Sequence, residues 1–189
     1  MQETSKSQKC ASFGDRTLET ERLILRPWRE SDAPDLYEYA KDETVANRTG
    51  FLPHKSVEDS LSILRDAGLM CEYNRAVCLK DGRAIGSIGL HMCDGRVEIG
   101  YWLGVPFWGR GLIPEAVKRV VRYAFDECGC TEIYIAYFDG NDNSRRVAEK
   151  CGFSYCFTDR DKLWTPTGRT VTEHFTVLSK EDYISKYNK

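Results

Sequence analysis

A glycine-rich segment, residues 104–111, is the part of the sequence best suited to hold an anion. It reads GVPFWGRG, follows a strand-like segment at 97–103 and precedes a segment with helically spaced apolar residues. The first turn of a helix exposes unpaired N–H groups and the positive end of the helix dipole. Gly109 and Gly111 carry no Cβ, so a phosphate can approach the backbone, and Arg110 adds a positive charge between them. The segment therefore predicts a site for a phosphate-bearing ligand.

Two common nucleotide-binding motifs are excluded for this segment. A P-loop needs a Lys-Ser or Lys-Thr pair after its glycines, and none follows here. A dinucleotide-binding fingerprint needs a third glycine, but Ile113 and Pro114 occupy that place. These exclusions leave either a phosphate-binding loop of another kind or a plain strand-to-helix turn.

Glu98 and Ser144 are the residues whose types and positions best suit acid–base chemistry. Glu98 stands in an otherwise apolar strand-like segment, where partial burial would raise the pKa of its carboxyl toward the range of a general base. Ser144 stands near the start of a helix-like segment and can donate from its hydroxyl. The alternatives are a strand carboxylate that faces water or pairs with an arginine, and a serine that bonds the helix backbone.

The spacing of apolar residues predicts the elements that hold these side chains in place. Strands are expected at 22–28, 76–79, 84–93, 97–103, 132–138, 153–159 and 170–178. Helices are expected from Ser31-Asp32 to about Lys41, from Ser56 to near Gly68, from about Pro114 to Cys128, from about Asp142 to Cys151, and at the charged end of the chain. The Asp-Gly pairs at 81–82 and 94–95 favour tight turns, so the middle strands form an antiparallel meander. Residues 42–55 are expected to form a loop, and residues 1–17 a polar, loosely held N-terminal arm.

Composition and charge exclude several classes of protein. The chain has 189 residues, the size of one domain, and a formal net charge of −2, which argues against a broadly basic nucleic-acid-binding protein. No apolar run approaches the roughly 20 residues of a membrane-spanning helix, and the first residues lack the apolar core of a signal peptide. The eight cysteines lack zinc-finger spacing and are expected to be free thiols in a reducing cytoplasm, with no metal site.

A cysteine nucleophile is the alternative chemistry for this chain. It needs a thiolate activated by a neighbouring histidine. His54, His91 and His174 are scattered along the sequence, and Cys151 has the helical spacing of a core residue. The pattern therefore disfavours this chemistry.

Three segments, in a fixed order, resemble a known family. They are LETERLILRP at 18–27, the stretch from Glu98 through the glycine-rich segment to Glu115-Ala116, and NDNSRRVAEKCGF at 141–153. Together they resemble the GNAT superfamily of N-acetyltransferases, and within it the Rim-like branch of ribosomal-protein N-terminal acetyltransferases. The resemblance covers about residues 17–185.

The resemblance implies a fold and a domain boundary. It implies a single α/β (α+β) domain over residues 18–189, with a mixed, mostly antiparallel sheet of about seven strands flanked by about four helices. The sheet is expected to splay between the strands at 97–103 and 132–138, and acetyl-CoA is expected to enter there.

The same resemblance implies an activity and a set of site residues. It implies transfer of an acetyl group from acetyl-CoA to a primary amine by direct attack, without a metal. Glu98 is the expected base, Ser144 the expected acid toward the leaving sulfur, and a backbone N–H of residues 100–104 the expected oxyanion donor. The residues implied to bind the cofactor are Trp102, Leu103, Gly104, Val105, Trp108, Gly109, Arg110, Gly111, Leu112, Ile113, Asn141 and Arg146.

Two positions depart from the family pattern. Ile113 ends the loop where glycine or alanine is common, which alters how the loop meets the pantetheine arm. Ala148 stands where many members carry a tyrosine acid, so that version of the mechanism does not carry over and Ser144 is the candidate acid.

These observations do not identify the amine that accepts the acetyl group. A protein N-terminal amine fits, and so does a small amine such as a polyamine or an aminoglycoside-like compound. A noncatalytic acyl-CoA-binding module would show the same loop. We expect a cytoplasmic monomer or homodimer with neither a membrane nor a nucleic acid as partner.

Overall fold

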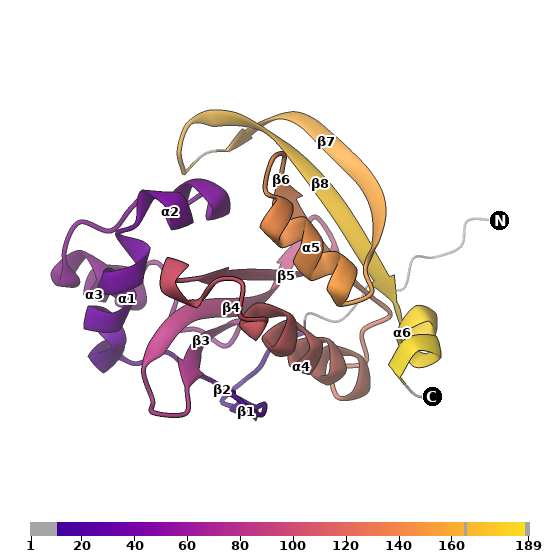
Figure 1. Ribbon diagram of the computed structural model, residues 1–189, viewed down its shortest axis with the longest axis horizontal. Helices are drawn as coiled ribbons and strands as arrows, with labels where there is room; N and C mark the ends of the chain where they lie inside the picture. The colour runs from indigo at the N-terminus through magenta and orange to yellow at the C-terminus, as the bar shows by residue number, and fades with distance from the viewer. Residues whose placement is uncertain (1–10, 165, 188–189) are drawn as a thin grey trace.

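One mixed sheet forms the centre of the molecule, and helices cover both of its faces (Figure 1). The computed structural model describes residues 11–164 and 166–187. Its eight-stranded sheet has the order β1-β2-β3-β4-β5-β6-β8-β7. The strands are β1 (Leu18–Glu19), β2 (Leu23–Arg26), β3 (Asn74–Leu79), β4 (Ala84–Cys93), β5 (Arg96–Leu103), β6 (Glu132–Phe138), β7 (Ser154–Trp164) and β8 (Arg169–Ser179). The α-helices are α1 (Ala33–Ala40), α2 (Glu43–Thr49), α3 (Val57–Asp66), α4 (Leu112–Asp126), α5 (Asp142–Lys150) and α6 (Lys180–Tyr187).

The junction between β5 and β6 divides the sheet into two halves. All other neighbouring strands are antiparallel, whereas β5 and β6 run parallel and pair only at Glu98 and Tyr134. Beyond that pair the two strands separate toward their carboxyl ends. The expected α/β fold, with its splayed and mostly antiparallel sheet, is therefore confirmed.

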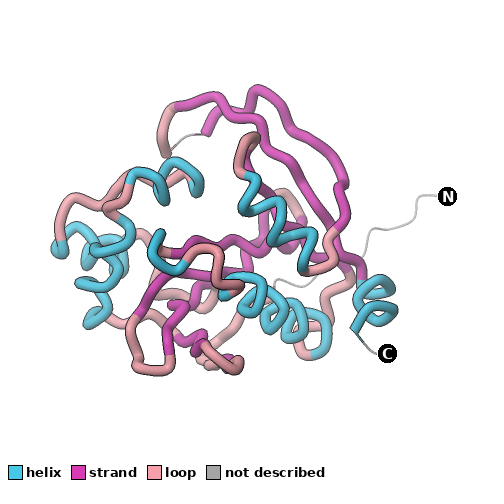
Figure 2. Tube along the Cα trace, in the orientation of Figure 1, coloured by secondary structure: helices cyan, strands magenta, loops and turns pink. Residues whose placement is uncertain are grey.

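The two faces of the sheet carry separate hydrophobic cores. Helix α4 places Val117, Val120 and Val121 in the larger core, where they pack with residues from β4, β5 and β6. Helices α1 and α3 cover the other face and form a smaller core that includes Leu36 and Leu64. Figure 2 shows α4 and α5 on one side of the strands and α1 and α3 apart from them. In the described part of the chain, no helix is long and apolar enough to cross a membrane.

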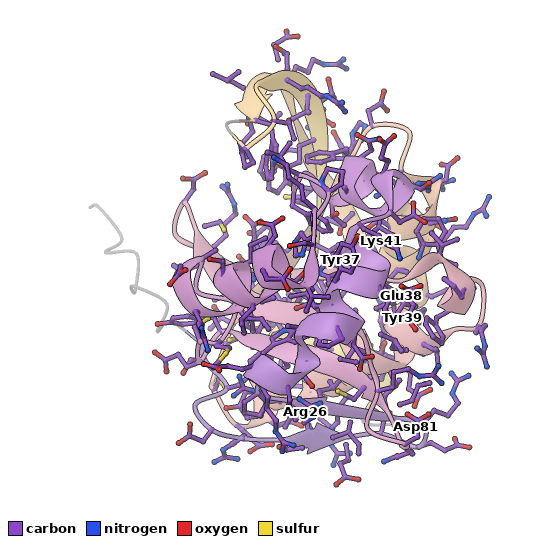
Figure 3. The ribbon with its side chains drawn as sticks, turned by 90° about the vertical axis from the view of Figure 1, so that its left-hand side faces the viewer. Arg26, Tyr37, Glu38, Tyr39, Lys41 and Asp81 are labelled. Atoms are coloured by element: carbon purple, nitrogen blue, oxygen red, sulfur yellow. The ribbon has the colours of Figure 1, made fainter. Side chains whose placement is uncertain are left out.

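A buried ion pair ties β2 to α1 and to the turn between β3 and β4. The Arg26 guanidinium donates to both carboxylate oxygens of Asp32, at 2.7 and 2.8 Å. It also donates to the carbonyl of Gly82, at 3.3 Å. In Figure 3, Arg26 and Asp81 accordingly lie below the labelled residues of α1. A buried, bidentate pair of this kind fixes geometry, because removing one partner leaves an uncompensated charge.

The structure corrects three expectations about the elements. The loop expected at 42–55 contains helix α2, the sheet has eight strands where about seven were expected, and six α-helices are described where about four were expected. Asp42 starts α2 by accepting a hydrogen bond from the N–H of Thr44 at 2.7 Å, and Gly50 ends it at a φ of 82°. The helix is only seven residues long, too short for its apolar spacing to predict it.

The N-terminal segment packs against the domain where the structure describes it. Phe13 is buried, stacks on Tyr123 with ring centroids 5.6 Å apart, and lies under the Arg75 guanidinium. The expectation of a loosely held arm is therefore wrong for Ala11 and Phe13, both of which are buried. Residues 1–10 of that arm lie outside the described residues, and the proposed boundary at residue 18 stays a prediction.

Candidate active site

A cleft of about 400 Å³ passes through the sheet where β5 and β6 separate. Its walls come from β4, β5, β6 and β8, from the loop before α4, and from the first turns of α4 and α5. Helix α2 contributes Val45, Arg48 and Thr49. The cleft therefore reaches from the face covered by α4 and α5 to the opposite face of the sheet.

The loop before α4 has the form of an anion-binding site. Gly109 and Gly111 both have a φ of 73°, a left-handed conformation that glycine adopts without strain. A Cβ on Gly109 would meet no atom within 4 Å, so the space above the loop is open. The first turn of α4 leaves the N–H groups of Leu112 and Ile113 without partners inside the helix, and both residues line the cleft. A phosphate group fits these amides and the positive end of the helix dipole.

Arg22 braces this loop from the side. Its guanidinium donates to the carbonyl of Arg110 at 2.9 Å and to the Glu115 carboxylate at 2.6 Å. Its backbone N–H also donates to Glu115, at 2.9 Å. Sequence reasoning had placed Arg22 only within a matching strand motif. The structure shows that it joins the start of β2 to both ends of the turn that opens α4.

Glu98 lies on the face of the sheet opposite to α4 and α5. Side chains alternate along a strand, so Val97 and Ile99 enter the core beneath α4 while Glu98 points the other way. Its cross-strand neighbour His91 shares that face and also lines the cleft. The Glu98 side chain keeps only 15% of its surface exposed.

The surroundings of Glu98 raise the pKa of its carboxyl. Burial is the largest cause, and the negative charge of Glu173 acts in the same direction. Arg96 opposes them, with its Nε 3.6 Å from a Glu98 oxygen, and Lys162 opposes them more weakly. Burial also lowers the pKa of His91, which favours its neutral form. The expected partial burial of Glu98 is confirmed, and the arginine of the alternative interpretation is also present.

Ser144 lies on the other face, in the first turn of α5. Its N–H donates to the side-chain oxygen of Asn141 at 3.3 Å, so Asn141 is the N-cap of the helix. The Asn141 amide also donates to the carbonyl of Arg48 at 3.2 Å, which holds the end of α2 near α5. The Ser144 hydroxyl lies 2.7 Å from the hydroxyl of Tyr101, a residue that sequence reasoning had not selected.

The cleft brings most of the predicted site residues together. The residues that line it are Glu98, Trp102, Leu103, Trp108, Gly109, Gly111, Leu112, Ile113, Asn141, Ser144 and Arg146. Gly104, Val105 and Arg110 do not line it. Gly104 packs so closely on Tyr39 that a Cβ would come within 2.6 Å of the ring, and Val105 faces a separate hollow. The Arg110 side chain lies over the ring of Phe107.

The alternative cysteine chemistry finds little support in this geometry. Cys93 lines the cleft with His91, but burial raises the pKa of its thiol and so disfavours the reactive thiolate. Burial raises the pKa of Cys151 to about 11. His54 bonds to the hydroxyl of Ser60, and His174 to that of Thr158. Among the described residues, no group of three or more His, Cys, Asp or Glu could hold a metal ion.

Comparison with known proteins defines the class to which this fold and cleft belong. Residues 22–154 match the family model of the acetyltransferase (GNAT) domain. That segment covers most of the chain and contains the glycine-rich loop, Glu98 and Ser144. The chain therefore belongs to the GNAT family of N-acetyltransferases.

Two relatives and one solved structure illustrate what this chain is similar to. The uncharacterized N-acetyltransferase p20 of Bacillus licheniformis is 31% identical over 88% of this chain and 98% of its own length. YdaF of Bacillus subtilis, described as a candidate ribosomal N-acetyltransferase, is 34% identical over 54% of this chain and 58% of its own. The microcin C7 self-immunity acetyltransferase MccE, solved with acetyl-CoA and AMP, has a TM-score of 0.71 at 18% identity, over 85% of this chain and 93% of its own. The resemblance to the GNAT superfamily is thus confirmed, and a protein described as a candidate ribosomal N-acetyltransferase is among those similar to this chain. The assignment to the Rim-like branch stays a prediction.

Proposed function

We propose that the protein transfers an acetyl group from acetyl-CoA to a primary amine by direct attack, with Glu98 as base and Ser144 as acid. One observation carries the proposal: a single cleft through the sheet joins a loop suited to bind an anion on one face to a partly buried carboxylate on the other. The two reactants would therefore meet between β5 and β6 without passing through a covalent intermediate on the protein.

The residues of the loop fit the chemistry of coenzyme A. The amides of Leu112 and Ile113, with the open space above Gly109, suit its diphosphate, and Asn141 and Arg146 suit the pantetheine and phosphate groups. When bound, acetyl-CoA supplies the acetyl thioester and its sulfur leaving group. Its presence in the structure of MccE, a protein of the same fold, supports this choice.

Side chains of this protein accept and donate the protons of the reaction. An alkylammonium group has a pKa near about 10, so it must lose a proton before nitrogen can attack, and Glu98 accepts that proton. As the C–N bond forms, backbone N–H groups of residues 100–104 face the oxyanion. As the C–S bond breaks, Ser144 donates its hydroxyl proton to sulfur and regains one from water. After the C–N bond forms, the nitrogen still carries one extra proton, which it releases to solvent and which offsets the proton that Ser144 takes back. Glu98 also returns its proton to solvent, so the reaction releases one proton for each ammonium group acetylated.

A screen of acceptors tests the proposal and separates the acceptor classes. Purified protein and labelled acetyl-CoA would be offered peptides with varied N-termini, polyamines and aminoglycosides. Labelled peptide alone would support a protein N-terminal amine, for which the description of YdaF is the present support. Labelled small amines alone would remove that assignment. Binding of acetyl-CoA without CoA release for any amine would leave a noncatalytic binding module and overturn the proposal.

We also propose that the protein acts in the cytoplasm. The seven cysteines of the described residues are all free thiols. Free thiols suit a reducing cytoplasm, where disulfides are rare.

The raised pKa of Glu98 predicts how activity depends on pH. Glu98 can accept a proton only when it is ionised, so kcat/KM should fall as pH falls through its folded-state pKa. Because burial raises that pKa, the acid limb should lie above the ordinary glutamate value of about 4.3. Initial rates between pH 4.5 and 9 would measure it. A kcat/KM that shows no acid limb and stays on its plateau down to pH 4.5 would contradict the assignment of Glu98 as the base.

Removing the brace on the loop should weaken cofactor binding. Arg22→Ala deletes the hydrogen bonds to Arg110 and Glu115, each worth about 1 kcal/mol, so the KM for acetyl-CoA should rise roughly fivefold to thirtyfold. The turnover number at saturating acetyl-CoA should change much less. Arg65→Ala is the matched control, because Arg65 pairs with Glu30 at an exposed position and neither residue lines the cleft. An unchanged KM in Arg22→Ala would show that the loop holds its shape without the brace.

A further inference from the structure

A tyrosine on β5, Tyr101, faces the cleft beside the candidate acid and has no role in the mechanism so far. We propose that Tyr101 is a positioning residue: its hydroxyl fixes that of Ser144 so that the serine hydrogen points to the departing sulfur. This inference rests on the proposed function, in which Ser144 is the acid. It adds a residue that neither the sequence motif nor the comparisons single out.

Two elements that are distant in sequence bring the hydroxyl groups together. The odd-numbered side chains of β5 point to the side of α4 and α5, and Tyr101 follows Val97 and Ile99 on that side. Its oxygen lies 2.7 Å from Ser144 Oγ and 3.3 Å from the carbonyl oxygen of Ser144. Both residues line the cleft. The cap from Asn141 holds the serine backbone, so Ser144 is fixed from two directions.

The chemistry of the pair decides which hydroxyl donates. A phenol is far more acidic than an alkyl hydroxyl, so Tyr101 is the better donor. Tyr101 has a single hydrogen to donate, and the contact with Ser144 Oγ at 2.7 Å is much shorter than the contact with the Ser144 carbonyl at 3.3 Å, so the hydrogen goes to Oγ. Burial raises the pKa of Tyr101, so the phenol keeps its proton over the whole working range of pH. Ser144 Oγ then accepts from Tyr101, and its own hydrogen remains free for a third group in the cleft.

The hydrogen bond from Tyr101 fixes the direction of the Ser144 hydroxyl, which helix α5 alone leaves undefined. A serine in the first turn of a helix rotates freely between solvent and backbone acceptors, so its hydrogen has no fixed direction. A donor at 2.7 Å removes those alternatives and leaves the cleft side open. Ala148, one helical turn after Ser144 on α5, is buried and offers no hydroxyl. Ser144 and Tyr101 therefore present two hydroxyl groups, in contact with each other, to the cleft at the start of α5.

The test is a double-mutant cycle on the full-length protein. Tyr101→Phe, Ser144→Ala and the double variant would be assayed by release of free CoA, with the amine from the acceptor panel that reacts fastest. We expect Tyr101→Phe to lower kcat about tenfold and to leave the KM for acetyl-CoA within about twofold, because one oriented hydrogen bond is lost. In the Ser144→Ala background the same change should have no further effect on kcat.

A matched control separates positioning from folding. Tyr123 is also buried and donates its hydroxyl to a backbone carbonyl, that of Ser12 at 2.8 Å, but it does not line the cleft. Tyr123→Phe should lose a similar hydrogen bond with unchanged kcat. An active protein whose Tyr101→Phe variant keeps full kcat, or loses as much kcat without Ser144 as with it, would overturn this inference and leave the proposed function standing. Absence of CoA release by the wild type with every amine would overturn both.

Discussion

Glu98→Gln is expected to lower kcat about a hundredfold to ten-thousandfold while acetyl-CoA still binds with its normal affinity. Glutamine keeps the size of the side chain and its place beside His91, but it cannot accept the proton that the amine must lose. General-base catalysis contributes about this range of rate enhancement. Binding should persist because the anion-binding loop lies on the opposite face of the sheet. Steady-state rates with calorimetric titration of acetyl-CoA would measure both quantities.

Glu173→Gln is the matched control for this prediction. Glu173 is a second carboxylate in the same cleft, but it pairs with Lys162 at 2.8 Å. Its charge helps to raise the pKa of Glu98, so its removal should shift the acid limb of kcat/KM to lower pH and largely preserve the plateau rate. If Glu98→Gln retains wild-type kcat, or if Glu173→Gln causes the larger loss, the base is assigned to the wrong residue.

Gly111→Val should raise the KM for acetyl-CoA about tenfold to a hundredfold. Gly111 is the N-cap of α4 at a φ of 73°, and a left-handed conformation costs a residue with a side chain roughly 1–2 kcal/mol. Branching at Cβ makes valine still less suited to that conformation. Either the first turn of α4 shifts, or the side chain covers the amides of Leu112 and Ile113. Both outcomes damage the anion site and leave Glu98 untouched.

Two further variants test whether a rise in the KM for acetyl-CoA comes from the changed loop at Gly111. Gly111→Asn should behave nearly as the wild type, because asparagine tolerates the left-handed region. Gly95→Val introduces similar strain at a φ of 77° in the turn between β4 and β5, at a residue that does not line the cleft, so it should reduce stability without changing the KM for acetyl-CoA. Equal KM values for Gly111→Val and Gly95→Val would contradict a role for the loop amides in binding the cofactor.

Apolar patterning predicted the elements that carry the site better than the elements that surround it. The strand at 97–103 and the helix after the glycine-rich segment have clear periodicity, and the structure has both within one or two residues at their ends. Helix α2 was missed because its seven residues bury only Val45 and Ala46 and depend on the Asp42 cap and on tertiary contacts. Arg48 and Thr49 of that helix line the cleft, so part of the site was invisible to periodicity.

The individual roles of Glu98, Ser144 and Tyr101 show a second limit of sequence reasoning. Residue type and neighbourhood pointed to Glu98 and Ser144, but not to their placement on opposite faces of the sheet. That placement follows from strand alternation combined with the single pair that joins β5 to β6. Tyr101 stands at an alternating position of the same strand, which gives its face but not its partner. Its contact with Ser144 spans 43 residues and exists only in the folded chain.

The initial-velocity pattern tests the central claim, direct transfer within one cleft, most directly. Rates of CoA release would be measured while acetyl-CoA and the amine selected by the acceptor screen are both varied. Direct attack requires both reactants to be bound together, so the double-reciprocal lines should intersect, with one labelled acetyl group on the amine for each CoA released. Parallel lines with an acetylated protein would show a covalent intermediate and contradict the account, as would acetyl-CoA binding without any transfer.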